Sequence, residues 1–397
     1  MKIVHIAPGT VYTEGWGYQD NLLPKYQARL GHEVYLIVPT LAFSGTEIQK
    51  TGEERYLSPD GFFVIRKNLL ALPCKLREAL RYFEVYEELL RIEPDMIFFH
   101  GLVSSTILQA VKYKKAHPAC VIVQDNHMDD NIGFRATFKG KLLSRAYKAL
   151  YRYTDRYIDK VYGVTPWRKQ YAEEVFGVPK SKTDVLLMGA DDEKIHLEDR
   201  LKTRAALRER YGFGDADFVI VSGGKIDEKK KILPLMDAVN GIGENVYLLL
   251  FGSPTEELKA AYRERLSEHV RDIGWIDADA CYAYFFMSDL AFFPGQHSVL
   301  WEQACASKVP CVFRLWDGME HVNNGGNADF IRDASVEAIT EKIRELRFTD
   351  RYARMKAVAE SDRTDIYLYS HIAKKSLELL EQTPRPQREG EHHVQLF

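Results

Sequence analysis

The 397-residue chain is long enough for two domains, and its 46% hydrophobic and 28% charged residues are the composition of an ordinary soluble globular protein. The formal net charge of −3 argues against binding nucleic acid through bulk charge, and no apolar run approaches the roughly 18 residues that span a bilayer. Five scattered cysteines without a CxxC pair predict reduced thiols, and an N-terminus without a signal-peptide pattern predicts a cytoplasmic protein.

The chain opens with the pattern of a strand, a glycine-rich loop, a helix and a second strand. Residues 2–7 predict the first strand, residues 19–30 the helix and residues 31–39 the second strand, which is the spacing of a doubly wound α/β domain. The loop lacks the GxGxxG fingerprint of dinucleotide-binding proteins. Because Gly15 and Gly17 have no side chain, a phosphate or sugar can approach their backbone N–H groups; the alternative is a flexible surface loop.

Polar residues follow two later strands of this half. The further elements predicted are hairpin strands 55–56 and 62–66, helix 76–91, strand 96–99, helix 106–115 and strand 120–124. His100 follows the strand 96–99, and Asp125, Asn126 and His127 follow the strand 120–124. Ligands of open α/β sheets sit beyond the carboxyl ends of the strands, so these residues are site candidates. His5 lies inside the first strand and is predicted to be a satisfied core residue.

Residues 135–169 are the most uneven part of the chain in charge. They contain ten basic and two acidic residues, with five tyrosines interleaved. Basic and aromatic residues on helices suit an anionic membrane surface, where each cation contributes about 1 kcal/mol. The alternative is a solvated helix whose tyrosines pack inward. Nucleic acid is a weaker third option, because no nucleic-acid motif accompanies the charge.

The second half begins after residue 190, where the composition becomes highly charged. A strand at 218–222 is followed by Gly223, Gly224 and Lys225 and then by the lysine run 229–231 at the head of a helix. These lysines are either a solvated face or fixed cations that neutralise a diphosphate. The elements expected next are strand 246–251, helix 256–268, strand 272–276, helix 279–287, strand 290–293, a helix from about 298, strand 310–313 and helices 335–346, 350–359 and 366–381.

The stretch 292–312 is the centre of the predicted site. Its strand, Pro-Gly turn and helix form an anion site near Ser298, because the first N–H groups of a helix have no internal partner. Glu302 lies about one turn further along the helix, where its carboxylate can accept hydrogen bonds from a diol such as a ribose. Asp-Ala-Asp strings at 215–217 and 277–279 are interpreted as surface turns and not as a metal site.

In this order and spacing the motifs resemble those of retaining glycosyltransferases of the GT-B fold, family 4, over residues 1–382. The resemblance implies an α/β fold of two Rossmann-like, doubly wound domains that face a cleft. Residues 1–190, completed by helix 366–382, would form the acceptor domain, residues 191–365 the nucleotide-sugar donor domain, and residues 383–397 a disordered tail. The donor substrate would be a nucleotide-diphosphate sugar, and no metal or other cofactor is expected.

The resemblance also gives roles to individual residues. The implied catalytic residues are His127, Lys225 and Lys231, the lysines standing where the family's Gly-Arg…Lys group grips the diphosphate. The implied donor-binding residues are Gly15, Gly17, Gly224, Ile276, His297, Ser298, Val299 and Glu302, with Ile276 near the base, Ser298 and Val299 at the diphosphate and Glu302 at the ribose. The implied acceptor-side residues are His100, Asp125 and Asn126.

The chain departs from the family at one position. The family pairs two glutamates as E-x7-E, and Pro294 stands where the first is expected, which leaves Gln296 and His297 near the transferred sugar. This departure puts the donor sugar in question and motivates a second hypothesis, a non-catalytic GT-B subunit that binds a partner enzyme or an acceptor. A sugar-nucleotide epimerase is less favoured, because no acid/base carboxylate set is found.

The acceptor is predicted from the basic segment. Residues 135–169 favour a lipid-linked glycan at an anionic membrane surface, as in capsule, exopolysaccharide or O-antigen synthesis. The expected location is the cytoplasm, with peripheral attachment to the inner face of the membrane. The nucleotide base, the sugar and the linkage are left open by these residues.

Overall fold

The N-terminal half of the chain folds around an eight-stranded sheet in the order β10-β9-β8-β7-β1-β2-β6-β5, in which only β5 runs antiparallel to its neighbour. The computed structural model describes residues 1–44, 47–70, 82–129 and 137–382. The strands are β1 (Lys2–Ile6), β2 (Glu33–Pro39), β5 (Glu54–Leu57), β6 (Phe63–Lys67), β7 (Met96–Phe99), β8 (Val121–Asn126), β9 (Lys160–Gly163) and β10 (Thr183–Val185). The helices are α1 (Gln19–Arg29), α3 (Tyr86–Ile92), α4 (Ile107–Ala116), α5 (Phe138–Thr154) and α6 (Pro166–Tyr171).

The second half forms a six-stranded, wholly parallel sheet in the order β13-β12-β11-β14-β15-β16. Its strands are β11 (Phe218–Ile226), β12 (Val246–Pro254), β13 (Val270–Gly274), β14 (Leu290–Phe293), β15 (Cys311–Arg314) and β16 (Ala328–Ile331). The helices are α7 (Asp192–Ile195), α8 (Arg200–Tyr211), α9 (Ile232–Ile242), α10 (Lys259–Arg263), α11 (Cys281–Met287), α12 (Leu300–Ala306), α13 (Val336–Leu346) and α14 (Asp350–Ala359). The strands are apolar along most of their length because helices cover both faces of a parallel sheet.

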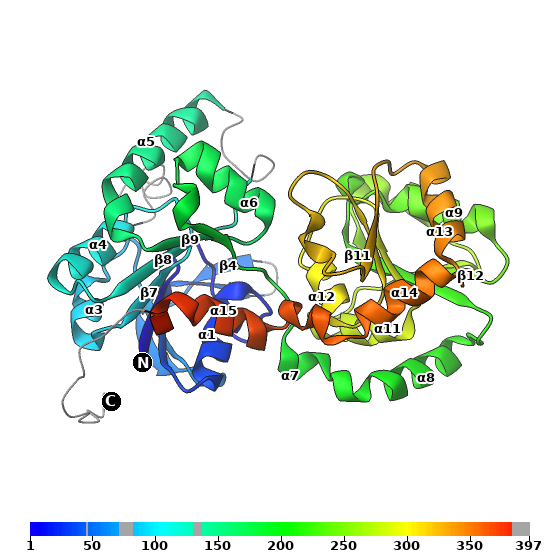
Figure 1. Cartoon of the computed structure of the whole chain (residues 1–397), viewed down its shortest axis with the longest axis horizontal. Helices are drawn as coiled ribbons and strands as arrows, with labels where there is room; N and C mark the ends of the chain where they lie inside the picture. Colours follow the sequence, from blue (N-terminus) through cyan, green and yellow to red (C-terminus); the bar gives the residue numbers. More distant parts are fainter. Residues whose placement is uncertain (45–46, 71–81, 130–136, 383–397) are drawn as a thin grey trace.

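The two domains lie side by side and are joined by two crossings of the chain (Figure 1). Ala190 carries the chain out of the first domain and pairs with the returning segment at Leu368. The last helix, α15 (Tyr369–Gln382), then packs against α1. Buried polar contacts fix this return, since the Gln27 side-chain amide donates to Ser376 Oγ at 2.9 Å.

Both sheets have a topological switch point at their first strand. β1 lies between β2 and β7, and β11 lies between β12 and β14, so the connections leave in opposite directions from each central strand. Ligands of such sheets bind in the crevice at the carboxyl ends of these strands. The topology therefore predicts that ligands bind near the segments that follow β1, β7, β11 and β14.

Glycines let β11 and β12 continue further than the sequence predicts. Gly224 and Gly252 are paired across the two strands and have φ values of +104° and +106°. A Cβ atom on Gly252 would lie 1.9 Å from the carbonyl oxygen of Gly224, so only glycine fits. The prediction that the strand ends at residue 222 is wrong, because paired glycines bend the two strands together without ending them.

Several other predicted boundaries are also corrected. Residues 82–85 are not helical, and the helix expected over 76–91 is α3 from Tyr86, with 71–81 outside the described residues. The helix expected over 256–268 is reduced to a 3-10 turn and α10, and β13 lies two residues earlier than predicted. β16 and the separate two-stranded sheet of β3 (Leu41–Ser44) and β4 (Glu47–Lys50) were not predicted. The predicted disorder of 383–397 lies outside the described residues.

Candidate active site

The loop after β1 is open to solvent. Gly15 has a φ of +75°, and a Cβ placed on Gly15 or Gly17 would meet nothing within 4 Å. The positive φ at residue 15 thus favours glycine there. At residue 17 a side chain would fit without a clash, so steric crowding does not explain why this residue is glycine. Contact of this loop with a donor stays a prediction.

Behind this loop, a chain of buried hydrogen bonds determines the protonation of His100. His5 Nε2 lies 2.7 Å from the side-chain oxygen of Gln27, an acceptor, so Nε2 carries the proton and Nδ1 of His5 must accept. His100 Nε2, 2.9 Å from that Nδ1, is therefore a donor. The structure confirms that His5 is a satisfied core residue, and burial together with the His100 charge lowers the pKa of His5 to about 3.

The other nitrogen of His100 faces two carboxylates. Nδ1 lies 2.8 Å from Asp125 Oδ2 and 3.1 Å from Asp20 Oδ1, which requires a second proton on the ring. His100 is consequently an imidazolium. Burial alone would lower its pKa, but Asp125 and then Asp20 outweigh burial and the pKa of His100 is raised.

Asp125 in turn holds His127 at the edge of the sheet. The Asp125 carboxylate is fully buried and accepts from the Gly101 backbone N–H at 2.7 Å, and its Oδ2 lies 3.3 Å from His127 Nε2. Burial would raise the pKa of Asp125, but the His100 and His127 charges lower it. The His127 side chain is 40% exposed. Within the cluster of Asp20, His100, Asp125 and His127, named here the N-terminal histidine cluster, His127 is the member that a substrate reaches most readily.

Asn126 has a structural task. Its side-chain amide donates to the carbonyl oxygens of Met128 and Arg168 at 2.9 and 2.8 Å, and it is fully buried. The polar atoms of Asn126 and of the fully buried Asp125 are thus used to shape the loop that carries His127, and their acceptor-side role stays a prediction.

In the second domain, Lys230, which was not among the predicted site residues, contacts the loop after β14. Lys230 Nζ donates to the carbonyl oxygen of Gln296 at 2.8 Å, and the Gln296 backbone N–H donates to Lys229 at 2.9 Å. Burial lowers the pKa of Lys230 to about 8. Lys225 is exposed at the end of β11 beside the bend at Gly224.

Lys231 has a different environment from Lys230. It has a left-handed backbone with φ of 54°, and its Nζ pairs with Glu228 at 2.8 Å. Because the backbone conformation changes at Lys231, the side chains of Lys230 and Lys231 reach different partners, although the two lysines are adjacent in the sequence. The predicted contact of Lys231 with a diphosphate stays a prediction.

Glu302 is enclosed by two histidines. Its Oε1 lies 2.9 Å from His297 Nε2 and 2.7 Å from His321 Nε2, and the carboxylate has no exposed surface. Burial would raise the pKa of Glu302, but His297 outweighs it and the pKa falls to about 2. Burial lowers the pKa of His297 against the effect of Glu302. A ribose could reach this carboxylate only in place of an imidazole, so the ribose role stays a prediction. Glu302, His297 and His321 are named the C-terminal histidine cluster.

The remaining predicted donor residues lie around these groups. α12 begins at Leu300, so Ser298 and Val299 precede it. The helix has only seven residues, and its dipole is therefore small. The Ser298 hydroxyl is buried without a partner among the described residues. Ile276 is half-buried against the core that contains α11 and α12, and the neighbouring Trp275 is 72% exposed.

The carboxyl edges of the two sheets meet at one junction. The Trp167 backbone N–H donates to Gly318 across the domains at 3.2 Å. A small cavity next to this contact is lined by Asp129, Thr165, Trp167 and Arg168 from the first domain and by Gln296, His297, Trp316 and Met319 from the second. These residues follow β8, β9, β14 and β15, so loops at the carboxyl edges of both sheets border this cavity, and of the predicted site residues His297 lines it.

The two histidine clusters also have the composition of metal sites. Among the described residues, His100, Asp125 and His127 form one group and His297, Glu302 and His321 another, with the ligand atoms of each group within 4.8 Å of one another. In both groups the carboxylate already joins the two imidazoles through hydrogen bonds. That no metal is needed stays a prediction.

Comparisons with known proteins agree with this geometry. Residues 23–194 match the model of Glycosyltransferase Family 4. The fold is similar to a glycosyltransferase from Rickettsia africae ESF-5 (TM-score 0.69, 15% identity, covering 96% of this chain and 98% of that one). It is also similar to Anabaena Alr3699/HepE in complex with UDP (0.66, 15%, 96% and 100%) and to WaaG, a glycosyltransferase involved in lipopolysaccharide biosynthesis (0.65, 14%, 96% and 100%). No curated protein gave a match.

The chain has the GT-B fold, and the match to the family 4 model covers its residues 23–194.

Sequence reasoning missed three polar residues of this candidate site. Asp20 could have been found from its place in the first turn of the helix after the glycine loop, where an acid is favourable. Lys230 could not be told from its neighbouring lysines. His321 lies 19 residues after Glu302, in a segment without a motif, and gave no signal.

Proposed function

We propose that this protein is a glycosyltransferase that moves a sugar from a nucleotide-diphosphate sugar to an acceptor hydroxyl with retention of configuration. The observation that carries the proposal is the junction at which the loops after β8 and β9 of one domain meet the loops after β14 and β15 of the other. A second pocket at this junction is lined by Trp167 together with Lys229 and Lys231. The complex of the similar Anabaena protein with UDP supports a nucleotide diphosphate as the leaving group.

Departure of the diphosphate requires fixed positive charge. Lys225 is exposed, and Lys230 is directed at the loop before α12 by its hydrogen bond to Gln296. Because burial lowers the pKa of Lys230 to about 8, an incoming diphosphate would stabilise its ammonium form. Cations held in place before the reaction stabilise the charge that develops on the phosphate as the bond to the sugar loosens.

His127 would act on the sugar. As the sugar–phosphate bond breaks, positive charge develops on the sugar ring, and the acceptor hydroxyl attacks from the face that the phosphate is leaving. The departing phosphate oxygen takes the hydroxyl proton, so bond breaking and proton transfer balance. His127, anchored by Asp125 at 3.3 Å, would orient the sugar, and the His100 imidazolium keeps that carboxylate ionised.

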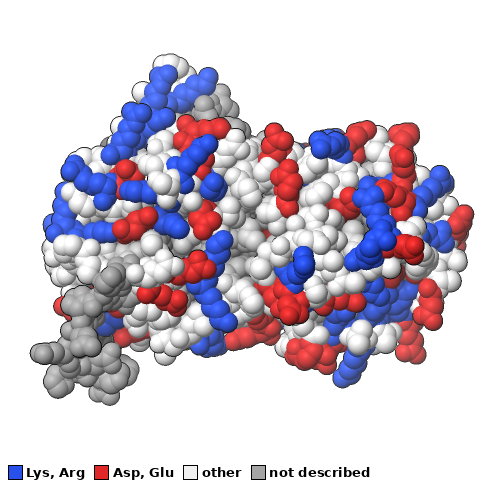
Figure 2. Space-filling view, viewed as in Figure 1, with Lys and Arg blue, Asp and Glu red and all other residues white. Residues whose placement is uncertain are grey.

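We further propose a lipid-linked glycan as acceptor, at an anionic membrane surface. Lysine and arginine side chains line the projecting helix α5 (Figure 2), and its first turns expose Phe138 and Leu142 to 81% and 59%. Tyr147 and Tyr151 pack inward, as the alternative interpretation of the tyrosines predicts. Among the described residues no helix is long and apolar enough to cross a membrane, so contact would be through the surface of α5.

Liposome binding tests the membrane contact. The protein should sediment with vesicles that contain anionic lipid at low salt, and Lys139→Glu combined with Lys141→Glu should release it. Matched reversals at the exposed Lys202 and at Lys259, whose side chain is 43% exposed, both in the other domain, should leave sedimentation unchanged. Equal binding to neutral vesicles, or no binding at all, contradicts this part of the proposal.

A second candidate is a non-catalytic subunit that binds a partner enzyme or acceptor. Pro294 occupies the position of the family's first glutamate, and Glu302 is enclosed by His297 and His321. A subunit of this kind would show no donor hydrolysis and no response to nucleotides, whereas the enzyme should hydrolyse its donor slowly when no acceptor is present.

The deciding experiment is thermal unfolding against a panel of nucleoside diphosphates. A ligand at 100 times its dissociation constant should stabilise the protein by about 2.7 kcal/mol. Lys225→Ala should abolish most of the shift, and Lys202→Ala, a matched exposed lysine, should not. If no diphosphate shifts the melting temperature, the donor site is absent and the subunit hypothesis takes its place.

A further inference from the structure

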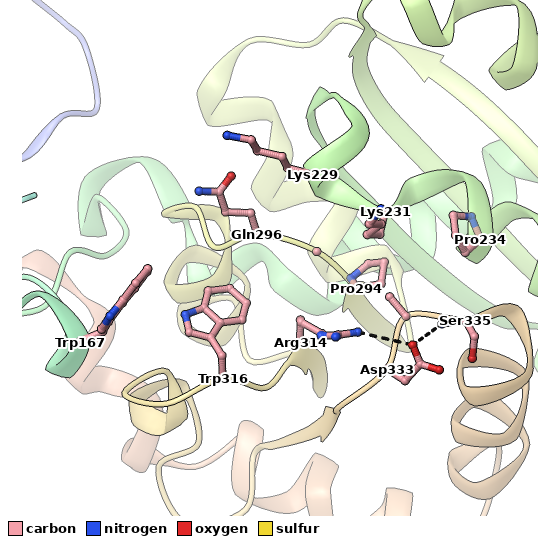
Figure 3. A pocket seen from close by; sticks show the side chains of 12 residues that line it. Trp167, Lys229, Lys231, Pro234, Pro294, Gln296, Arg314, Trp316, Asp333 and Ser335 are labelled. Carbon is pink, nitrogen blue, oxygen red and sulfur yellow. Dashed lines mark hydrogen bonds and ion pairs between the residues drawn. The ribbon is translucent and has the colours of Figure 1, made fainter. Parts of the chain in front are cut away.

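A pocket with a volume of about 680 Å³ lies at the domain junction. Trp167 enters it from the first domain, and Trp316, Arg314 and Asp333 line it from the loops after β15 and β16 (Figure 3). The volume is in the range of small-ligand sites. Of the residues predicted to hold the donor, Lys231 lines this pocket, whereas Lys225, Ile276 and Glu302 do not.

The charged groups of the pocket are mostly cationic. Arg314, Lys229 and Lys231 line it, against the single carboxylate of Asp333. Arg314 Nη1 lies 4.0 Å from Asp333 Oδ1, and the Asp333 side chain is 71% exposed, so this pair is weak. The guanidinium can therefore turn to a ligand anion, for which its planar pair of donors is well suited.

Two indoles, one from each domain, form the opposite end of the pocket. The rings of Trp167 and Trp316 lie 6.4 Å apart at 81° to each other. The Trp316 ring also packs against Trp301, with the ring centres 5.5 Å apart. Its ring N–H points toward Trp167 in Figure 3, is buried and finds no acceptor among the described residues. An indole offers an apolar face together with a single donor, which matches a sugar ring with its C–H face and hydroxyl groups.

We propose that this pocket binds an anionic saccharide, namely the part of the acceptor next to the reacting hydroxyl. This inference rests on the proposed function, in which Gln296 lies near the transferred sugar. Gln296 also lines the pocket, so a saccharide seated between the indoles would lie beside the sugar end of the donor and not at its nucleotide end. The negative charge, a phosphate or a carboxylate, would lie against Arg314 at the other end.

Calorimetric titration with small probes tests the pocket directly. Glucuronic acid and glucose 6-phosphate carry the two kinds of charge, glucose carries none, and inorganic phosphate lacks the ring. At least one charged sugar should bind ten times more tightly than glucose and than inorganic phosphate. Arg314→Gln should remove this preference by weakening the charged sugar about tenfold, whereas Arg332→Gln, an exposed arginine outside the pocket, should change nothing.

A second variant tests the pocket independently, in case Arg314→Gln does not fold. Trp167→Ala changes the other domain, keeps the backbone contact to Gly318, and should weaken charged and neutral sugars alike. The titrations are repeated with the nucleoside diphosphate that gives the largest thermal shift. Displacement of the sugar by that nucleotide would assign the pocket to the donor and overturn the proposal, and so would binding that survives both variants. Equal affinity for inorganic phosphate and charged sugars would reduce the pocket to an anion site and also overturn it.

The two proposals fail separately. If no nucleotide shifts the melting temperature but charged sugars bind in an Arg314-dependent manner, the transfer function is contradicted and the saccharide site is retained. If nucleotides bind and every sugar probe fails, the donor site is retained and the saccharide site is contradicted.

Discussion

Both histidine clusters contain a buried carboxylate between two imidazoles, but the N-terminal histidine cluster has Asp20 in addition, and the two clusters differ in the charge that their surroundings impose. In the N-terminal histidine cluster, His100 receives a proton at both nitrogens because His5 accepts on one side and Asp125 and Asp20 on the other. In the C-terminal histidine cluster, the second nitrogen of His321 has no partner among the described residues, and burial lowers the pKa of His297. Partners beyond the shared carboxylate decide which histidine is charged.

The two histidine clusters also differ in how far their imidazoles are exposed to solvent. The His127 side chain is 40% exposed, whereas those of His297 and His321 are only 6% and 5% exposed. The N-terminal histidine cluster thus presents one imidazole to the junction on a charged support. The C-terminal histidine cluster ties the loop after β14 and the loop after β15 onto α12. The first arrangement suits catalysis and the second suits holding loops in place.

Removing the carboxylate charge from each cluster should give the largest difference between the two clusters, measured as loss of unfolding free energy. Asp125→Asn leaves the buried His100 imidazolium with one counter-ion, and loss of a partner from a buried ion pair costs about 3–5 kcal/mol. Glu302→Gln keeps one oxygen acceptor but loses the charge that strengthens the hydrogen bonds to His297 and His321, and it should cost about 1–3 kcal/mol. Urea unfolding of both variants measures the difference. Equal losses would contradict the assignment of charge to His100.

Replacing the accessible imidazole should affect activity rather than stability. His127→Ala should lower sugar transfer at least about 100-fold, the scale of losing one preorganised stabilising group, with little change in melting temperature. His371→Ala, at an exposed histidine of α15, is the matched control in the same assay. A near-wild-type rate for His127→Ala would remove this residue from the site.

The pH dependence of stability should have opposite signs in the two clusters. The pKa of His100 is raised above its ordinary value of 6.5, so its contribution is complete below pH 6.5 and is lost as the pH rises through the folded-state pKa. The pKa of Glu302 is lowered from 4.5 to about 2, so its contribution is complete above pH 4.5 and is lost as the pH falls toward 2. Unfolding of His100→Gln and Glu302→Gln across pH 3–9, each relative to wild type, measures both trends; parallel trends would contradict the comparison.

The smallest expected effect is that of metal removal. In both clusters hydrogen bonds already satisfy the carboxylate, and the proposed function assigns the positive charge for the diphosphate to lysines, so dialysis against EDTA should leave transfer and melting temperature unchanged. Dialysis against buffer without chelator is the control. A loss of activity that one divalent ion restores would show that at least one cluster is a metal site.

The sequence by itself determined the elements whose pattern is local. β7 and β14 have the predicted bounds, because each is a short, wholly apolar run between polar residues. α13 and α14 agree to within one residue, because Ser335 and Thr349 cap helices with clear apolar periodicity. The order of strands and helices was sufficient to predict two doubly wound sheets and to place His100 and His127 at strand ends.

The tertiary structure decided what depends on distant partners. Only folding brings Asp20, His100 and Asp125 together from three separate segments and so fixes a proton on His100. Only folding encloses Glu302 with His321, and only the backbone turn at Lys231 distinguishes Lys230 from its neighbours. Local pattern carries information about burial and backbone preference, whereas protonation, enclosure and side-chain direction depend on neighbours that the order of residues does not bring together.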